Sequence, residues 1–102
     1  MPMTVIVTRN VEDRYRGFLA SCMLEIAPGV YTGPRMTSGV RERVWRVLAE
    51  WHNTLRQGAI IMTWSEPAAP GGQGIRLLGE PARNLHDSDG IMLVRRSLHD
   101  LL

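Results

Sequence analysis

The chain of 102 residues lacks the features that mark secreted and membrane proteins. Its single cysteine, Cys22, excludes an internal disulfide and a metal site built from several cysteines, which fits a reducing compartment. The longest uninterrupted apolar runs span only a few residues, too short for a transmembrane helix. The first residues, MPMTVIV, also lack the basic flank and long apolar core of a signal peptide. We therefore expect a cytoplasmic protein that does not enter a membrane.

Lysine is absent, and all twelve basic residues are arginine. The formal net charge is only +2, which excludes a polycation that would bind nucleic acid over its whole surface. Each arginine nevertheless presents a planar guanidinium group that suits bidentate contact with phosphate. Hydrophobic residues make up 44% of the chain, so a single domain over residues 1–102 can bury a real core.

The first third of the chain predicts a strand, a helix and a turn. Residues Thr4–Thr8 are rich in β-branched side chains and predict a strand that is buried on both faces. Asn10 is a favourable N-cap for the helix that follows. The segment EIAPGVYTG predicts two short extended pieces around a Pro28-Gly29 turn. The helix itself is predicted from apolar residues at helical spacing, namely Val11, Tyr15, Phe18, Leu19, Cys22, Met23 and Ile26.

The rest of the chain predicts a second helix and three strands. This helix should begin near Ser38 and end before Gly58, because apolar residues recur between them at helical spacing. The strands are AIIMTW, IRLLG and IMLVRRSL, with EPARNLHDSDG as the connection before the last. The resulting order is β-α-β-β-α-β with an extra C-terminal strand, which favours a ferredoxin-like α+β sandwich with both helices on one face. Its other face would expose residues such as Ile61 and Leu77.

The acidic pair Glu12 and Asp13 follows the first strand and allows two interpretations. Both carboxylates would lie in the first turn of the helix, where they interact favourably with the helix dipole, and Asp13 could bond back to Asn10. Alternatively they could bind a metal ion for hydrolysis. A hydrolytic metal site would also require a carboxylate at the end of the strand. Arg9 occupies that position and would repel Mg²⁺. The residues therefore favour the structural interpretation.

The arginines of the same junction allow a second pair of interpretations. On a helical wheel Arg14 and Arg16 lie about 100° to either side of the apolar stripe, so they flank the buried face. With Arg9 and Asn10 they surround a helix N-terminus, whose free N–H groups favour anions. Either the arginines contact phosphate, or they are a solvated pair that contributes little.

From Val7 to Gly33 the sequence VTRNVEDRYRGFLASCMLEIAPGVYTG resembles the CRISPR-associated Cas-two family, and its type I-E branch in particular. The joined patterns N-V-x-x-R-x-R-G and G-V-Y-x-G carry the resemblance. It continues through RERVWRVLAE, AIIMTW and DSDGIMLV, and so spans nearly the whole chain.

The resemblance implies a ferredoxin-like homodimer at the centre of the spacer-acquisition complex. There it would bridge two dimers of the Cas-one integrase and carry double-stranded DNA across its surface. Residues 90–102 would form a strand that pairs with the partner subunit and a tail that binds the integrase. The DNA-contacting positions of the branch fall here on Asn10, Arg14, Arg16 and Arg83, although the second basic residue expected beside Arg83 is Ala82.

The resemblance also raises the question of catalysis. Other members carry an acid at the end of the first strand, which is associated with metal-dependent nuclease activity, whereas this chain has Arg9. We therefore expect a DNA-binding scaffold with no catalytic residue, no metal site and no cofactor. The alternative is a Mg²⁺-dependent endonuclease acting on RNA or DNA, which would have to use Glu12 or Asp13.

Overall fold

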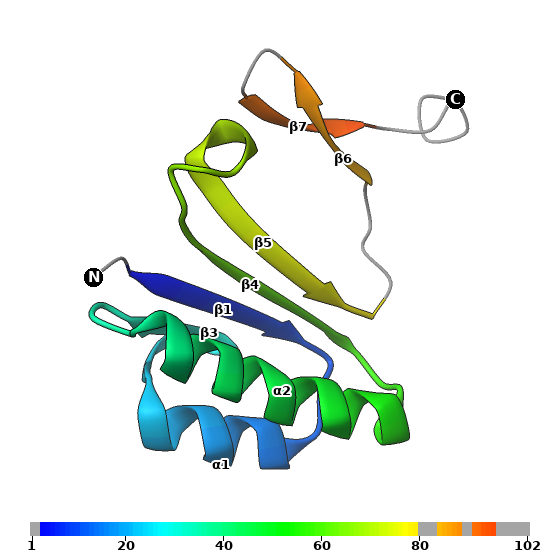
Figure 1. The fold of residues 1–102 in the computed structure, drawn as a ribbon. Coiled ribbons are helices and arrows are strands. Elements are labelled where there is room, and N and C mark those ends of the chain that lie inside the picture. The colour runs from blue at the N-terminus through cyan, green and yellow to red at the C-terminus, as the bar shows by residue number, and fades with distance from the viewer. Residues whose placement is uncertain (1–2, 80–83, 89–90, 96–102) are drawn as a thin grey trace.

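The fold begins with the predicted order of a strand, a helix, two strands, a helix and a strand (Figure 1). The computed structural model describes residues 3–79, 84–88 and 91–95, with side chains for residues 3–79. The helices of this part are α1 (Asp13–Cys22), α2 (Ser38–Leu55) and the short 3-10 helix η1 (Pro70–Gly72). The strands are β1 (Thr4–Arg9), β2 (Leu24–Ala27), β3 (Val30–Gly33), β4 (Ala59–Ser65), β5 (Gln73–Leu78), β6 (Asn84–Ser88) and β7 (Ile91–Arg95).

The main sheet has the strand order β2-β3-β1-β4-β5, and every pair of neighbours is antiparallel. The first four strands, taken with α1 and α2, form the predicted β-α-β-β-α-β ferredoxin-like unit, so the predicted fold class is confirmed. Strand β5 continues the sheet beyond β4, because a short turn-rich segment returns the chain antiparallel to β4. The C-terminal end of β1 thus lies in the interior of the sheet, next to the first residue of β4.

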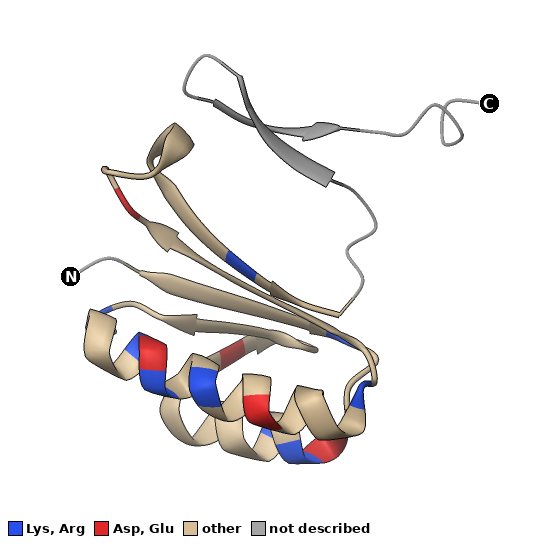
Figure 2. Ribbon diagram, turned by 45° about the vertical axis from the view of Figure 1, so that its right-hand side comes forward, with Lys and Arg blue, Asp and Glu red and all other residues tan. Residues whose placement is uncertain are grey.

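Both helices lie against the same face of the sheet and bury the core there (Figure 1). In α1 the predicted apolar stripe supplies the buried side chains of Tyr15 and Leu19, and in α2 it supplies Val44 and Leu48. Trp45 lies off the stripe of α2 but is also buried. Charged positions gather along both helices (Figure 2), and all of them except the buried Arg41 of α2 are exposed or half-buried. The core comprises Ile6, Tyr15, Leu19, Met23, Tyr31, Met36, Val44, Trp45, Leu48, Ile60 and Met62.

The ends of the helices differ in part from the prediction. Helix α1 stops at Cys22, and the predicted stripe residue Ile26 is exposed in β2, because the chain must straighten to pair with β3. Helix α2 begins at Ser38 as predicted, and the Thr37 hydroxyl accepts the N–H of Val40 at 3.2 Å as its cap. It ends at Leu55 with Arg56 as its C-cap, one residue earlier than Gly58 as the residue after the cap would place it.

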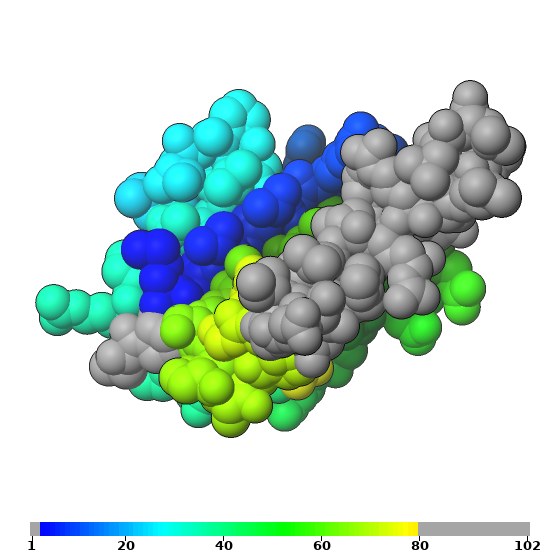
Figure 3. Space-filling model, turned by 90° about the horizontal axis from the view of Figure 1, so that it is seen from above, coloured from blue at the N-terminus to red at the C-terminus, as the bar shows by residue number. Residues whose placement is uncertain are grey.

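The face of the sheet opposite the helices carries a row of apolar residues. Figure 3 looks onto this face, on which β1 appears in blue and β5 in yellow. Val7, Ile61 and Leu77 are direct neighbours in the strand register and are 38%, 39% and 36% exposed. The predicted exposure of Ile61 and Leu77 is therefore confirmed. The prediction that β1 is buried on both faces is wrong, because only its helix-facing side chains, such as Ile6, lie in the core.

The C-terminal part forms a second hairpin, in which β6 and β7 pair antiparallel in a separate sheet of two strands. The strand predicted from Ile91 is present as β7. Strand β6 lies inside the segment that the sequence predicts as a connection, so that prediction is wrong there. Within the described residues, β7 takes its pairing partner from its own chain. Of the predicted C-terminal strand and tail over residues 90–102, residue 90 and residues 96–102 lie outside the described residues, as do Ala82 and Arg83.

Candidate nucleic-acid interface

The junction between β1 and α1 is a sharp turn rather than a capped helix start. Asn10 adopts a left-handed backbone conformation, with φ at 58°, which asparagine tolerates better than most residues. Glu12 is the N-cap residue of α1, and its side chain makes no capping hydrogen bond. The predicted N-cap at Asn10 is therefore wrong. Because β1 pairs with β4 as far as Arg9, the chain needs further residues to leave the sheet before a helix can begin.

Arg14 lies on the exposed side of α1, as the helical wheel predicts. Its side chain is 54% exposed, and its Nε lies 3.4 Å from a carboxylate oxygen of Glu12. Its guanidinium carbon also lies 5.7 Å from the ring centre of Trp51 in α2, within the range of a cation–π contact. Trp51 is itself held edge-on against Tyr15, at 5.3 Å between ring centres. The contact with Trp51 thereby orients the Arg14 guanidinium, while about half of the side chain stays exposed to solvent.

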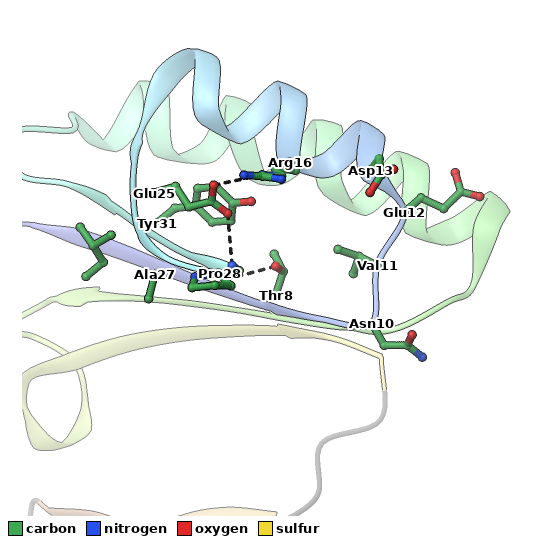
Figure 4. Close-up of a pocket in the computed structure, with 12 residues that line it drawn as sticks. Thr8, Asn10, Val11, Glu12, Asp13, Arg16, Glu25, Ala27, Pro28 and Tyr31 are labelled. Carbon is green, nitrogen blue, oxygen red and sulfur yellow. Dashed lines mark hydrogen bonds and ion pairs between the residues drawn. The ribbon is translucent and has the colours of Figure 1, made fainter.

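Arg16 reaches from α1 to the hairpin of β2 and β3 (Figure 4). Its Nε donates to a carboxylate oxygen of Glu25 at 3.1 Å, while its side chain remains 71% exposed. The other carboxylate oxygen of Glu25 accepts the N–H of Gly29 at 3.2 Å. Glu25 therefore fixes Arg16 against the turn that the sequence predicts at Pro28-Gly29. No local sequence pattern indicated that Glu25 would be the partner of Arg16.

Arg16 and Glu25 line an open pocket of about 560 Å³ between the start of α1 and the β2–β3 turn. Arg16, Glu12 and Asp13 come from the helix side, and Glu25 comes from the hairpin side. Asn10 lines the same pocket but lies apart from the Arg16–Glu25 pair (Figure 4). The structure thus brings Asn10 and Arg16 to one pocket, with Arg14 on the neighbouring surface of α1.

The acidic side chains of the junction do not build a metal site in the part of the chain that the structure describes. No group of three or more His, Cys, Asp or Glu side chains is placed there to bind a metal ion. Glu12 is paired with Arg14, and Arg9 stands at the end of β1, where a carboxylate would be needed. The side chains that the structure describes at this junction therefore do not form a metal site.

The Glu25 carboxylate makes the stability of the hairpin depend on pH. The N–H of Gly29, and after it the Arg16 guanidinium, holds the pKa of Glu25 below its ordinary value of 4.5. A carboxyl group whose pKa is lower in the folded than in the unfolded chain stabilises the fold above the unfolded value. That contribution is lost as the pH falls through the lower, folded value.

Glu25→Gln is therefore expected to destabilise the protein at neutral pH but not in acid. Glutamine keeps an oxygen for the Gly29 N–H but loses the charge that attracts Arg16. Urea unfolding midpoints of wild type and variant, measured from pH 7 down to pH 2, should differ at pH 7 and converge in acid. A constant difference across this range would mean that the shape of the side chain matters and its charge does not.

No helix among the described residues combines the length and the apolar character needed to cross a membrane. Compared with known protein families, residues 3–93 match the family described as CRISPR-associated protein (Cas_Cas2CT1978). The match runs from the start of β1 into β7, and it includes the junction that carries Asn10, Arg14 and Arg16. The chain therefore belongs to this Cas-two-like family of CRISPR-associated proteins.

Proposed function

We propose that this protein is the DNA-binding scaffold of a spacer-acquisition complex of the type I-E branch. In this role a homodimer bridges Cas-one integrase dimers and holds duplex DNA against the junction of β1 and α1. The observation that carries the proposal is the pair of exposed cations, Arg14 and Arg16, on the first turns of a helix. Membership in a CRISPR-associated family supports the cellular setting, and Asn10 and Arg83 complete the proposed contact set.

The carboxylates that pair with the two arginines do not prevent contact with DNA. The side chains of Arg14 and Arg16 are more than half exposed. Ion pairs between such exposed side chains contribute roughly 0–1 kcal/mol, so a phosphate group can replace the carboxylate at little cost. Arginine also retains further N–H donors after Nε is used, and these can point to a second acceptor. The carboxylates therefore orient the two guanidinium groups but leave them able to bind a phosphate group.

A fluorescence titration of duplex DNA into the complex with its integrase tests the proposal. Because phosphate contacts carry no base information, duplexes of unrelated sequence should bind with similar affinity. Failure of the assembled complex to bind any duplex more tightly than the integrase alone would overturn the proposal.

The alternative function, a Mg²⁺-dependent endonuclease acting on RNA or DNA, predicts a different result. With Arg9 at the end of β1 and Glu12 paired with Arg14, we expect no cleavage of either nucleic acid in Mg²⁺ or Mn²⁺. The measurement is a nuclease assay on purified protein, with Glu12→Ala and Asp13→Ala variants as controls. Cleavage that survives purification and disappears in either variant would support the endonuclease instead.

The open face of the sheet leads us to expect a homodimer. Its row of Val7, Ile61 and Leu77 is a surface that a second copy could cover. The apolar segment IMLVRRSL, which begins at Ile91, could add to the sheet edge of that copy, so we expect the C-terminal strands to be exchanged. Light scattering at micromolar concentration should give twice the chain mass of 11.5 kDa. A monomeric mass for the intact chain would contradict this expectation.

A further inference from the structure

A second pocket, of about 610 Å³, lies where β1 ends, β4 begins and β5 ends. Asn10 lines both this pocket and the one that contains Arg16. The two pockets differ in charge, because the first contains carboxylates whereas none of the described residues around the second is acidic. We call the second the Arg9–Arg56 pocket, and its described lining is Arg9, Asn10, His52, Arg56, Gly58, Ala59 and Gly79.

The walls of this pocket are built from unusual backbone. Among the described residues, the two non-glycine residues with positive φ are Asn10 at 58° and Arg56 at 50°, and both line it. Gly58 and Gly79 also have positive φ, at 80° and 85°. A Cβ atom on Gly79 would lie 2.3 Å from the carbonyl oxygen of Gly58, so these turns pack backbone against backbone. Backbone in sparsely populated conformations concentrates at binding sites, where the surrounding fold stabilises it.

The polar side chains of the pocket are anchored by the turn between α2 and β4. The His52 Nε2 lies 3.2 Å from the carbonyl oxygen of Gly58, and since a carbonyl can only accept, this nitrogen carries the hydrogen. The Arg56 Nε donates to the carbonyl oxygen of Asn53 at 3.3 Å. Such a bond uses one donor of the guanidinium fork and leaves the terminal nitrogens for another acceptor. Arg9 is the exposed last residue of β1. Two cations therefore line one pocket. They come from the ends of β1 and α2, which lie on the same side of the molecule (Figure 1).

We propose that the Arg9–Arg56 pocket binds one phosphate group of the DNA backbone in each copy of the protein. Two guanidinium groups that line one cavity repel each other. A phosphate group between them would attract both and so outweigh that repulsion. Because Asn10 borders both pockets, a strand that passes Arg16 can continue past Asn10 to Arg9. This inference rests on the proposed DNA-binding function and extends the contact surface beyond α1. It also assigns a role to the arginine that stands at the end of the first strand.

The test is the salt dependence of duplex DNA binding by the complex with its integrase, comparing wild type with Arg9→Gln/Arg56→Gln. One lost phosphate contact in each copy should reduce the log–log salt slope by about 1.8 in the dimer, at about 0.9 per contact. The charge-preserving Arg9→Lys/Arg56→Lys variant should retain the slope. The matched control is Arg43→Gln/Arg46→Gln on the exposed side of α2, which should leave the slope unchanged. An unchanged slope in Arg9→Gln/Arg56→Gln would overturn the inference while leaving the proposed function in place.

A second measurement tests phosphate binding by the pocket independently of DNA binding by the complex. Inorganic phosphate is titrated into the protein alone while the ring signals of His52, assigned with a His52→Gln variant, are followed by NMR. A saturable shift in wild type that is absent in Arg9→Gln/Arg56→Gln supports phosphate binding by the pocket, even if the complex proves not to bind DNA. A complex that does not bind DNA would overturn the proposed function and, with it, the assignment of the bound phosphate to DNA, while the pocket would remain a phosphate site. Absence of any shift in wild type, together with an unchanged salt slope, would mean that the pocket binds no phosphate.

Discussion

Arg14→Ala/Arg16→Ala is expected to flatten the log–log salt dependence of DNA binding by roughly 3 to 4 units. A symmetric dimer presents each arginine twice, so up to four phosphate contacts are lost. Each contact contributes about 0.9 to the slope through release of condensed counterions. Affinity should fall to a similar extent for unrelated duplexes, because these contacts do not read bases. The measurement is a DNA titration of the integrase complex across a salt series.

The fold should survive this double substitution. The Arg16 side chain is 71% exposed and its pair with Glu25 is screened by solvent, so its loss should cost little. Loss of the contact between Arg14 and Trp51 should cost up to about 1 kcal/mol. Arg43→Ala/Arg46→Ala on α2 is the matched control, since it removes the same charge from another exposed surface. Equal changes in slope for the two double variants would show that diffuse charge, and not the start of α1, attracts the DNA.

Gly58→Ala is expected to destabilise the protein by roughly 2–5 kcal/mol. Its φ of 80° imposes about 1–2 kcal/mol of strain on any residue with a Cβ. The added Cβ would also lie 2.4 Å from the carbonyl oxygen of Asn10 and 2.5 Å from that of Arg9. Moving backbone apart to relieve such an overlap typically costs about 1–3 kcal/mol. Urea unfolding at a fixed protein concentration measures the change.

Gly17→Ala is the control for this prediction, because it adds the same methyl group where there is space. Gly17 lies in α1 with nothing within 4 Å of its added Cβ. Alanine there should stabilise the helix by roughly 0.5–1 kcal/mol. A Gly58→Ala protein as stable as wild type would mean that the junctions of β1 and α2 can separate freely. The close backbone approach around the Arg9–Arg56 pocket would then not be a fixed feature.

Local sequence patterns determined the architecture of this protein. Apolar residues at helical spacing were sufficient to predict α1 and α2, and β-branched segments were sufficient for β1 and β4. Their order along the chain then led to the ferredoxin-like unit, because two helices of this length cover only one face of such a sheet. The same reasoning correctly placed Ile61 and Leu77 on the open face. It failed at β6, because the segment EPARNLHDSDG was predicted as a connection and residues 84–88 of it instead pair with β7.

The details of the candidate site were decided by tertiary structure. Helical spacing showed that Arg14 and Arg16 flank the buried stripe, but it could not show that Glu25 and Trp51 orient them. Glu25 lies on a strand after the helix has ended, and Trp51 lies on the other helix. The conformation of Asn10 likewise depends on how far β1 pairs with β4.

The Arg9–Arg56 pocket is the clearest example of a feature that local sequence patterns could not predict. Its cations come from the ends of β1 and α2, and Gly79 follows β5, so no local pattern in the sequence connects them. Periodicity reports only which side of an element faces the core. Which charges meet at the ends of those elements depends on chain reversals and close backbone approaches, and these exist only once the sheet has formed.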